Sequence, residues 1–251
     1  MKTIAIIPAR FPSTRFPGKP LAQIMGKTMI ERVYRQAEKC QKLSEIWVAT
    51  DDERIIREVE RFGGNVILTS PDCQSGTDRC AEAYQKMVLK ADLVVNIQGD
   101  EPFIRPEQLD QIINLMEKSK GQIGTLCKKL SERLAVFNPN VVKVVKSSQG
   151  RALYFSRNPI PFVRGSAQED WIERADFFKH IGLYAYRTEA LLELSQLAPG
   201  KLELAESLEQ LRWLEAGYTI YVSETDWESI GIDTPEDLKW VEKHWLEISN
   251  E

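Results

Sequence analysis

The segment Ile6–Pro20 reads IIPARFPSTRFPGKP. Its first four residues are the end of the first apolar run of the chain, TIAIIPA (Thr3–Ala9). The run is short and rich in β-branched residues, which is typical of a buried strand. The residues after it hold several prolines, and proline has a fixed φ and no backbone N–H, so the segment cannot continue as a helix or a sheet strand. We therefore predict a strand followed at once by a stiff loop that carries Arg10, Arg15 and Lys19.

Further along the chain, short β-rich runs alternate with amphipathic stretches. The apolar runs EIWVAT, NVILTS and DLVVNIQGD are separated by helix-like stretches such as ERIIREVERFG and DRCAEAYQKMVL. Strands that alternate with helices at this spacing favour an α/β fold with a mostly parallel sheet covered on both faces.

The second half has a different pattern. VVKVVKSSQGRALYFSR predicts a hairpin that turns at 147–150, and HIGLYAY and YTIYVSE predict further strands. Helical patterns return at LELAESLEQLRWLEAG and at TPEDLKWVEKHWLE, where Thr234 and Pro235 supply a helix start. We expect one domain with a β-rich insertion in its second half.

Composition excludes several classes of function. The chain has 251 residues with 33 basic and 37 acidic side chains, so its overall charge of −4 gives no attraction to nucleic acid or to a membrane surface. No apolar run approaches the ~20 residues of a membrane span, and the run before Pro8 is too short for a signal peptide. Four cysteines without C-x-x-C spacing favour a reduced, cytoplasmic setting.

The basic loop predicts a polyphosphate site. Ligands of parallel α/β sheets bind beyond the carboxyl ends of the strands, where this loop begins. It is not a P-loop, because Pro20 follows Gly18-Lys19 and Leu21 stands where Gly26-Lys27-Thr28 would need the first glycine. G-x-G-x-x-G is absent as well, and a solvated surface loop is the alternative.

Two aspartates are candidates for a metal site beside that loop. Asp100 ends the run VVNIQGDEP, and Asp233 follows a short apolar run in GIDTPEDL. A carboxylate opposite a polyphosphate calls for a cation between them, and Mg²⁺ is held by one or two carboxylates while phosphate oxygens and waters complete its shell. The alternatives are a helix-cap or turn role for Asp100 and, equally compatible with the spacing, an N-cap of the following helix for Asp233.

Nine motifs follow one another along nearly the whole chain: PARFPSTRFPGKP (Pro8–Pro20), ATDD (Ala49–Asp52), SGTDR (Ser75–Arg79), NIQGDEP (Asn96–Pro102), FNPNVVKVV (Phe137–Val145), ALYFSR (Ala152–Arg157), KHIGLYAYR (Lys179–Arg187), LEQLR (Leu208–Arg212) and DTPEDL (Asp233–Leu238). In this order they resemble the 3-deoxy-D-manno-octulosonate (Kdo) cytidylyltransferase family, the CMP-Kdo synthetases. The sialic acid cytidylyltransferases have a different opening pattern, PARGGSKxxxxKN.

The resemblance implies a Rossmann-like three-layer nucleotidyltransferase fold, a homodimer and a reaction in lipopolysaccharide biosynthesis. CTP and Kdo would give CMP-Kdo and pyrophosphate by in-line attack of the sugar's anomeric hydroxyl at the α-phosphate, assisted by Mg²⁺. We expect a nucleotide-binding half over about 1–121, a sugar-binding and dimerisation part over about 122–225, and a returning metal loop with the C-terminal helix over 226–251.

The resemblance also implies roles for individual residues. The basic loop neutralises the triphosphate, the two aspartates hold the metal, and an arginine with a glycine-opened backbone matches a pyrimidine. Catalytic roles fall to Arg10, Lys19, Asp100 and Asp233, the last two as metal ligands. CTP binding falls to Pro8, Ala9, Arg10, Ser13, Arg15, Lys19, Ser75, Gly76 and Arg79. Kdo binding falls to Gln98, Arg157, His180, Tyr184, Glu209 and Gln210.

Several alternatives stay open. Ser75-Gly76 is also a plain helix start, and the i, i+3, i+4 spacing of Glu206, Glu209 and Gln210 predicts one polar helix face that is either functional or simply wet. The stretch 163–177 and residues 227–230 depart from the family pattern. Rival functions are a pyrophosphorylase for a sugar 1-phosphate and a catalytically silent nucleotide-sugar sensor, and an amino analogue of Kdo is an alternative sugar.

Overall fold

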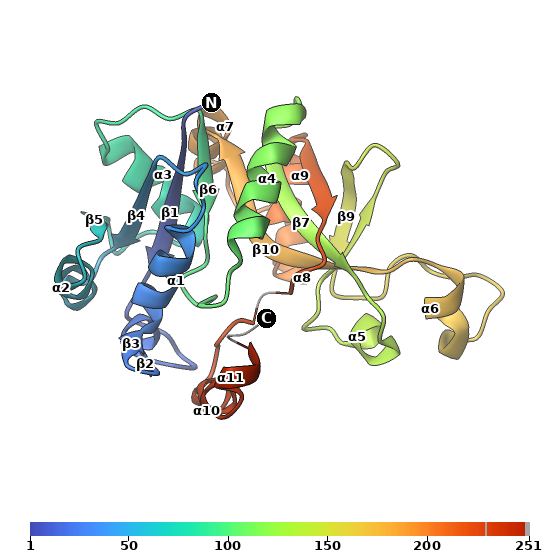
Figure 1. Ribbon diagram of the computed structural model, residues 1–251. Helices are drawn as coiled ribbons and strands as arrows, with labels where there is room; N and C mark the ends of the chain where they lie inside the picture. The colour runs from blue at the N-terminus through green and yellow to red at the C-terminus, as the bar shows by residue number, and fades with distance from the viewer. Residues whose placement is uncertain (229, 249–251) are drawn as a thin grey trace. The chain divides into compact units, whose positions relative to one another are not determined.

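The computed structural model describes residues 1–228 and 230–248, and Ser229 of the divergent 227–230 stretch and the end of the predicted 226–251 segment lie outside them. The chain divides into two compact units, which we describe separately (Figure 1). Unit 1 comprises 1–110 and 229–251, and unit 2 comprises 111–228. No helix within the described residues is long and apolar enough to cross a membrane.

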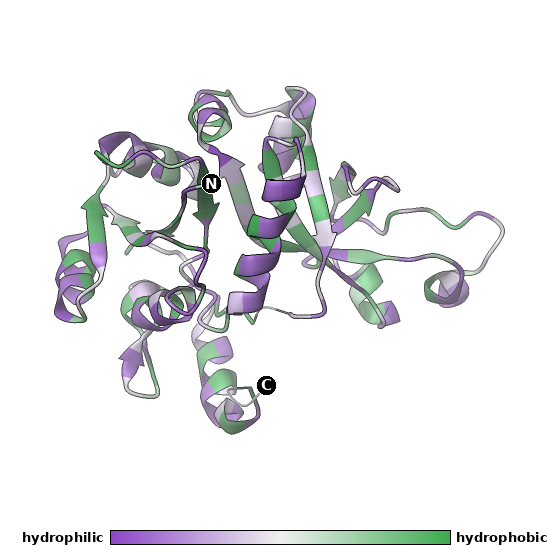
Figure 2. Ribbon diagram, turned by 45° about the horizontal axis from the view of Figure 1, so that its top comes forward, coloured by the Kyte–Doolittle hydropathy of each residue, from purple (hydrophilic) through white to green (hydrophobic). Residues whose placement is uncertain are grey.

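Unit 1 is built on a parallel sheet of four strands. Their order is β6-β1-β4-β5, and Ile4 to Ala9 of β1 lie in register with Glu45 to Thr50 of β4. The central residues of β1 and β6 are fully buried, as expected where helices cover a parallel sheet, and both strands are strongly hydrophobic in Figure 2. The strands are β1 (Thr3–Ala9), β4 (Glu45–Thr50), β5 (Asn65–Leu68) and β6 (Leu93–Asn96), with a separate small pair β2 (Gln23–Ile24) and β3 (Lys27–Thr28).

The helices of unit 1 begin at capping residues that the sequence supplies. Thr28, Asp52, Ser75 and Thr234 each accept a backbone N–H in the first turn of their helix, which satisfies donors that the helix itself cannot. The helices are α1 (Met29–Ala37), α2 (Glu53–Arg61), α3 (Gly76–Lys86), α10 (Pro235–Lys243) and α11 (Trp245–Ile248), with a short 3₁₀ turn at Lys19–Leu21; α4 (Pro106–Lys118) begins in unit 1 and ends in unit 2.

Unit 2 contains a mixed sheet. Strand β7 pairs in parallel with β11 and antiparallel with β10, and β8 pairs with β10 and with β9. The predicted hairpin is confirmed, since β8 and β9 are antiparallel and Gly150 adopts a positive φ of 77° in the turn between them. The strands are β7 (Ile123–Lys129), β8 (Lys143–Lys146), β9 (Ala152–Ser156), β10 (Phe178–Arg187) and β11 (Ile220–Glu224).

One predicted helix of unit 2 is wrong. The stretch from Lys201 to Glu215 forms two helices, α8 (Lys201–Glu206) and α9 (Gln210–Glu215), because Ser207 adopts a left-handed conformation with φ 51°. Glu206 and Gln210 therefore do not share one helical face. The remaining helices are α5 (Arg133–Phe137), α6 (Trp171–Arg174) and α7 (Thr188–Leu194), with a 3₁₀ turn at Gln168–Asp170 in the divergent stretch. The predicted fold class, α/β with a mostly parallel sheet and a β-rich second half, is confirmed.

Candidate active site

The basic loop follows β1 and is closed on itself. The Gly18 amide donates to the carbonyl oxygen of Phe11 at 3.0 Å, and Gly18 has a φ of 73°, a left-handed conformation that favours glycine. A Cβ at this position would also lie 3.0 Å from the ring of Phe11, which carries the guanidinium of Arg54 on its face at 3.3 Å. The backbone before Lys19 is therefore held in one conformation, which fixes where the Lys19 side chain begins.

A cavity of about 830 Å³ opens beside this loop, and every lining residue belongs to unit 1. It contains all nine residues predicted to bind CTP, both predicted metal ligands and one residue predicted to bind the sugar. These are Pro8, Ala9, Arg10, Ser13, Arg15, Lys19, Ser75, Gly76 and Arg79, then Asp100 and Asp233, and Gln98. The sequence did not single out Phe11, Gln74 or Cys73, which line the same cavity.

Three charged side chains meet in this cavity around Lys19. Its Nζ lies 2.6 Å from Oδ2 of Asp100 and 3.1 Å from Oδ1 of Asp233, while the Arg15 guanidinium lies 3.1 Å from the other oxygen of Asp233. The Lys19 side chain is 15% exposed, so the ammonium is largely shielded from water. Both carboxylates thus converge on one cationic group.

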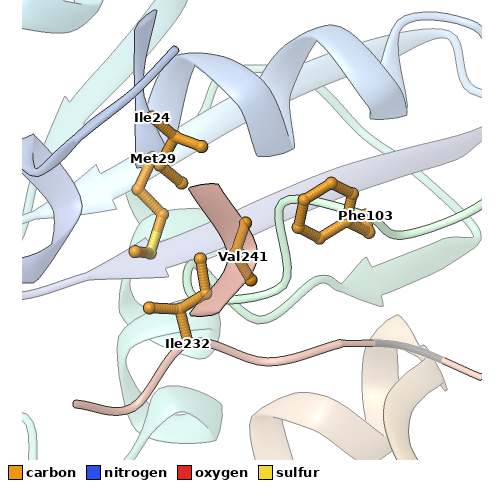
Figure 3. Packing of buried hydrophobic residues seen from close by; sticks show 5 residues of the cluster. All are labelled: Ile24, Met29, Phe103, Ile232 and Val241. Carbon is orange, nitrogen blue, oxygen red and sulfur yellow. The ribbon is translucent and has the colours of Figure 1, made fainter. Parts of the chain in front are cut away.

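A buried cluster brings the two aspartates together although they are far apart in the sequence. Ile232 packs with Met29 and Val241, in the cluster that also contains Ile24 and Phe103 (Figure 3). The Ile232 amide donates to the carbonyl oxygen of Asp100 at 2.9 Å, which fixes the two loops side by side. Burial of these apolar side chains stabilises the arrangement that the like-charged carboxylates oppose.

The helix-cap alternatives for the two aspartates are wrong. Thr234 is the N-cap of α10, and its hydroxyl accepts from the Asp237 amide at 3.1 Å. The Asp237 carboxylate in turn accepts from the amides of Asp233 and Thr234, which leaves the Asp233 side chain to the cavity. Asp100 caps no helix, since the next one begins at Pro106, but it does lie in a turn, in which the Glu101 amide donates to the Gln98 carbonyl oxygen at 3.3 Å.

The opposite wall of the cavity combines a helix start with a buried arginine. Ser75 forms a capping box with Asp78, so the helix-start interpretation of this motif is correct, and Ser75 and Gly76 line the cavity as well. Arg79 is only 4% exposed; it donates to the Thr69 hydroxyl at 2.5 Å and lies 3.4 Å from the Asp51 carboxylate. A Cβ on Gly76 would touch Pro8 at 3.4 Å, so the wall is tight at this point.

Cys73 is not a nucleophile in this site. Burial and the neighbouring Glu82 carboxylate, 3.0 Å from its sulfur, raise the pKa of the thiol to about 12. The thiolate is therefore negligible near neutral pH. No group of three or more His, Cys, Asp or Glu side chains suited to a metal occurs in residues 1–228 and 230–248.

The other predicted sugar-binding residues lie in unit 2, and the guanidinium of one of them, Arg157, is bonded to the protein backbone. The Arg157 guanidinium donates to the backbone carbonyl oxygens of Glu206 at 2.7 Å, Pro139 at 3.1 Å and Ser207 at 3.3 Å. Glu206 accepts from the Ser156 hydroxyl at 2.6 Å and from the Arg157 amide at 2.9 Å. These bonds join the end of β9 to the end of α8.

His180 and Tyr184 belong to an aromatic cluster on β10. The His180 ring lies edge-on to Phe155, with 5.0 Å between the ring centroids, and its centroid is 5.3 Å from that of Tyr184. Burial lowers the pKa of His180 to about 3, so the ring is neutral near pH 7. Its Nε2 lies 3.0 Å from the Thr125 hydroxyl, which also lies within hydrogen-bond distance of the carbonyl oxygens of Ile181, at 3.1 Å, and Leu183, at 2.9 Å.

The two remaining sugar-side candidates lie at the start of α9, where Glu209 is the N-cap and Gln210 the first helical residue. Gln210 is 5% exposed, and Glu209 accepts from the Arg212 guanidinium at 2.7 Å. Their roles toward a sugar stay predictions.

Comparison with known proteins identifies the family. A family profile described as Cytidylyltransferase matches residues 4–225. A 3-deoxy-manno-octulosonate cytidylyltransferase of Bacteroides thetaiotaomicron is 55% identical over 246 residues, 97% of this chain and 98% of that protein, and one of Cytophaga hutchinsonii is 54% identical over 236 residues, 94% of each. The chain belongs to the 3-deoxy-manno-octulosonate cytidylyltransferase family.

Solved structures agree with this membership. A structure of CMP:2-keto-3-deoxy-manno-octonic acid synthetase complexed with CTP superposes with a TM-score of 0.91 at 42% identity, covering 98% of this chain and 99% of the other. A cytidylyltransferase from Leptospira borgpetersenii superposes at 0.63 with 16% identity, which shows the shared fold alone. The resemblance inferred from the nine cytidylyltransferase motifs is confirmed.

Proposed function

We propose that this cytidylyltransferase transfers CMP from CTP to the anomeric hydroxyl of Kdo, forming CMP-Kdo and pyrophosphate. The observation that supports this most directly is the cavity of unit 1, which gathers the basic loop, the tight pyrimidine wall and two convergent carboxylates. Family membership supports the substrates, since the relatives are named for this sugar and the related solved structure holds CTP.

We infer a task in the reaction for each wall of the cavity. Arg10, Arg15 and Lys19 lie where cations can neutralise the triphosphate and the departing pyrophosphate. Transfer of a phosphoryl-type group needs positioning and charge neutralisation rather than covalent help, and the protonated Cys73 agrees with this. Gly76 and Arg79 limit and orient the base.

Asp100 and Asp233 fit Mg²⁺. Their carboxylates already share one cation, the Lys19 ammonium, and Mg²⁺ needs no more than one or two protein carboxylates when phosphate oxygens and waters complete its shell. When bound, the ion would supply Lewis-acid polarisation of the phosphate that is attacked. Lys19 would then exchange its carboxylate partners for phosphate oxygens.

A sugar-dependent assay tests the proposal. Pyrophosphate release from CTP is measured with Kdo, with its amino analogue and with a panel of sugar 1-phosphates, each with and without Mg²⁺. We expect release with Kdo and Mg²⁺ only. Release with a sugar 1-phosphate would favour a pyrophosphorylase, and CTP binding without release for any sugar would favour a sensor.

We further propose a homodimer, a cytoplasmic location and a role in lipopolysaccharide biosynthesis. The family resemblance supports all three, and the four free thiols support a reducing compartment. Light scattering tests the dimer, and loss of Kdo-containing lipopolysaccharide on depletion of the protein tests the role.

A further inference from the structure

The strongest unexplained feature of unit 1 is a carboxylate behind the pyrimidine wall. Asp51 follows the last residue of β4, and its side chain is 13% exposed. One of its oxygens, Oδ2, lies 3.4 Å from the Arg79 guanidinium, while Oδ1 is buried and has no hydrogen-bond partner among the described residues. A carboxylate kept only for stability would be expected to satisfy both oxygens, because an unpaired buried oxygen costs free energy.

The groups around Arg79 fix the direction of its guanidinium. Thr69, just after β5, accepts from Nη1 at 2.5 Å, the Ser70 carbonyl oxygen accepts from the same Nη1 at 3.4 Å, and Asp51 lies 3.4 Å from Nη2. Residues that follow the neighbouring strands β4 and β5 therefore hold the Nη1–Nη2 edge of the group. Arg79 itself comes from α3 and lines the cavity. A guanidinium has five N–H donors in a rigid plane, so fixing one edge orients the donors that remain.

We propose that Asp51 is a positioning residue for base selection, which acts by aiming Arg79 at the pyrimidine edge of CTP. This rests on the proposed function. Cytosine presents the acceptors O2 and N3, whereas N3 of uracil carries a proton. A guanidinium held so that it donates to N3 pairs with cytosine and meets a second donor on uracil. The countercharge of Asp51 also offsets the cost of keeping Arg79 charged where it is 4% exposed.

Asp51→Asn tests the proposal, with Asp52→Asn as its matched control. Asp52 is the next residue and its side chain is 17% exposed, but it caps α2 and pairs with Arg54. The measurement is the binding of CTP and of UTP by calorimetry with Mg²⁺ and without sugar, beside kcat/KM for both nucleotides with Kdo. We expect Asp51→Asn to reduce the CTP-to-UTP ratio about tenfold, the lower end of the effect known for outer-shell partners of metal ligands, and Asp52→Asn to change it less than twofold.

A double variant separates positioning from a purely structural role. In an Arg79→Met background, Asp51→Asn should change the CTP-to-UTP ratio by less than twofold, because no guanidinium remains to be aimed. An unchanged ratio in a folded Asp51→Asn protein, or an equal further loss in the Arg79→Met background, would overturn the proposal. If Asp51→Asn fails to fold, Thr69→Val removes the side-chain acceptor at Nη1, leaves the Ser70 carbonyl oxygen in place and should lower the ratio in the same direction.

The calorimetry keeps this inference separate from the proposed function. If wild-type protein binds CTP in preference to UTP but releases no pyrophosphate with Kdo, the proposed reaction fails while the role of Asp51 can still be measured. If wild-type protein shows no preference between the two nucleotides, the role of Asp51 fails even where turnover with Kdo is seen.

Discussion

The nucleotide side and the predicted sugar side of this cytidylyltransferase use their charged groups differently. In the cavity of unit 1, the side-chain partners of Lys19 and Arg15 are the aspartates of the same site. In unit 2, Arg157 donates to three backbone carbonyl oxygens. Groups paired with other site groups can exchange partners when a ligand arrives, whereas an arginine bonded to the backbone also holds the fold. The comparison therefore predicts that substitutions in the cavity of unit 1 change activity without unfolding the protein. Substitution of Arg157 in unit 2 should change both activity and stability.

The largest effect is expected for Asp100→Ala, which should lower kcat at least about a hundredfold, or ~2.7 kcal/mol, at saturating Mg²⁺. The reason is loss of one of the two carboxylates that converge on a cation. Steady-state kinetics and thermal melting measure the effect. Asp176→Ala serves as control, because Asp176 forms an ion pair with Lys129 in which both side chains are 62% exposed. If the Asp100→Ala protein kept more than about a tenth of the wild-type kcat, the assignment of Asp100 as a metal ligand would be contradicted.

Arg157→Ala should raise the KM for Kdo at least about thirtyfold, while the Kd for CTP without sugar should change less than about threefold. The three backbone contacts add a second expectation, a lower melting temperature, because three carbonyl oxygens lose their donor. Kinetics with varied Kdo, calorimetry with CTP and melting curves separate these effects. Equal losses for both ligands would mean that Arg157 supports only the architecture.

Lys19→Met should lower kcat/KM for CTP at least about tenfold, since a cation near the triphosphate is lost. The same change should tighten Mg²⁺ binding to the protein without CTP, because the ammonium no longer competes for Asp100 and Asp233. Calorimetry with Mg²⁺ alone measures this second result. Lys27→Met is the control, as Lys27 pairs only loosely with Glu31 at 3.7 Å. Unchanged affinities for both CTP and Mg²⁺ would support the alternative that the basic loop is a solvated surface loop without a role in CTP binding.

The smallest effect concerns His180 and pH. Its folded pKa of about 3 lies below the ordinary value of 6.5, so between these values the unfolded chain binds more protons and stability falls as pH falls. His180→Gln should remove at most about 2 kcal/mol of the stability lost between pH 7 and 5. Urea unfolding at both pH values measures this, with His244→Gln as control. An identical pH dependence in wild type and His180→Gln would contradict the burial of a neutral ring.

The sequence predicts well which residues line the cavity of unit 1, because local rules govern their placement. Arg10 directly follows one strand and Asp100 comes shortly after another, so both must lie at one edge of a parallel sheet, and the prolines stiffen the loop between Arg10 and Lys19. It fails between α8 and α9, where helical periodicity continues through Ser207 but the chain turns left-handed. The Glu206 carboxylate at that turn bonds Ser156, fifty positions earlier, and no local pattern encodes such a contact. Asp51 behind Arg79 was missed for the same reason.

The discontinuity of unit 1 has a consequence for synthesis on the ribosome. Lys19 and Asp100 are made early, whereas Asp233 and the apolar residues Ile232 and Val241 that hold it emerge only after all of unit 2. Until then the nascent chain has the basic loop and one carboxylate, and the segment that donates to the Asp100 carbonyl oxygen does not yet exist. Translation order thus delays assembly of the acidic pair until both units are almost complete.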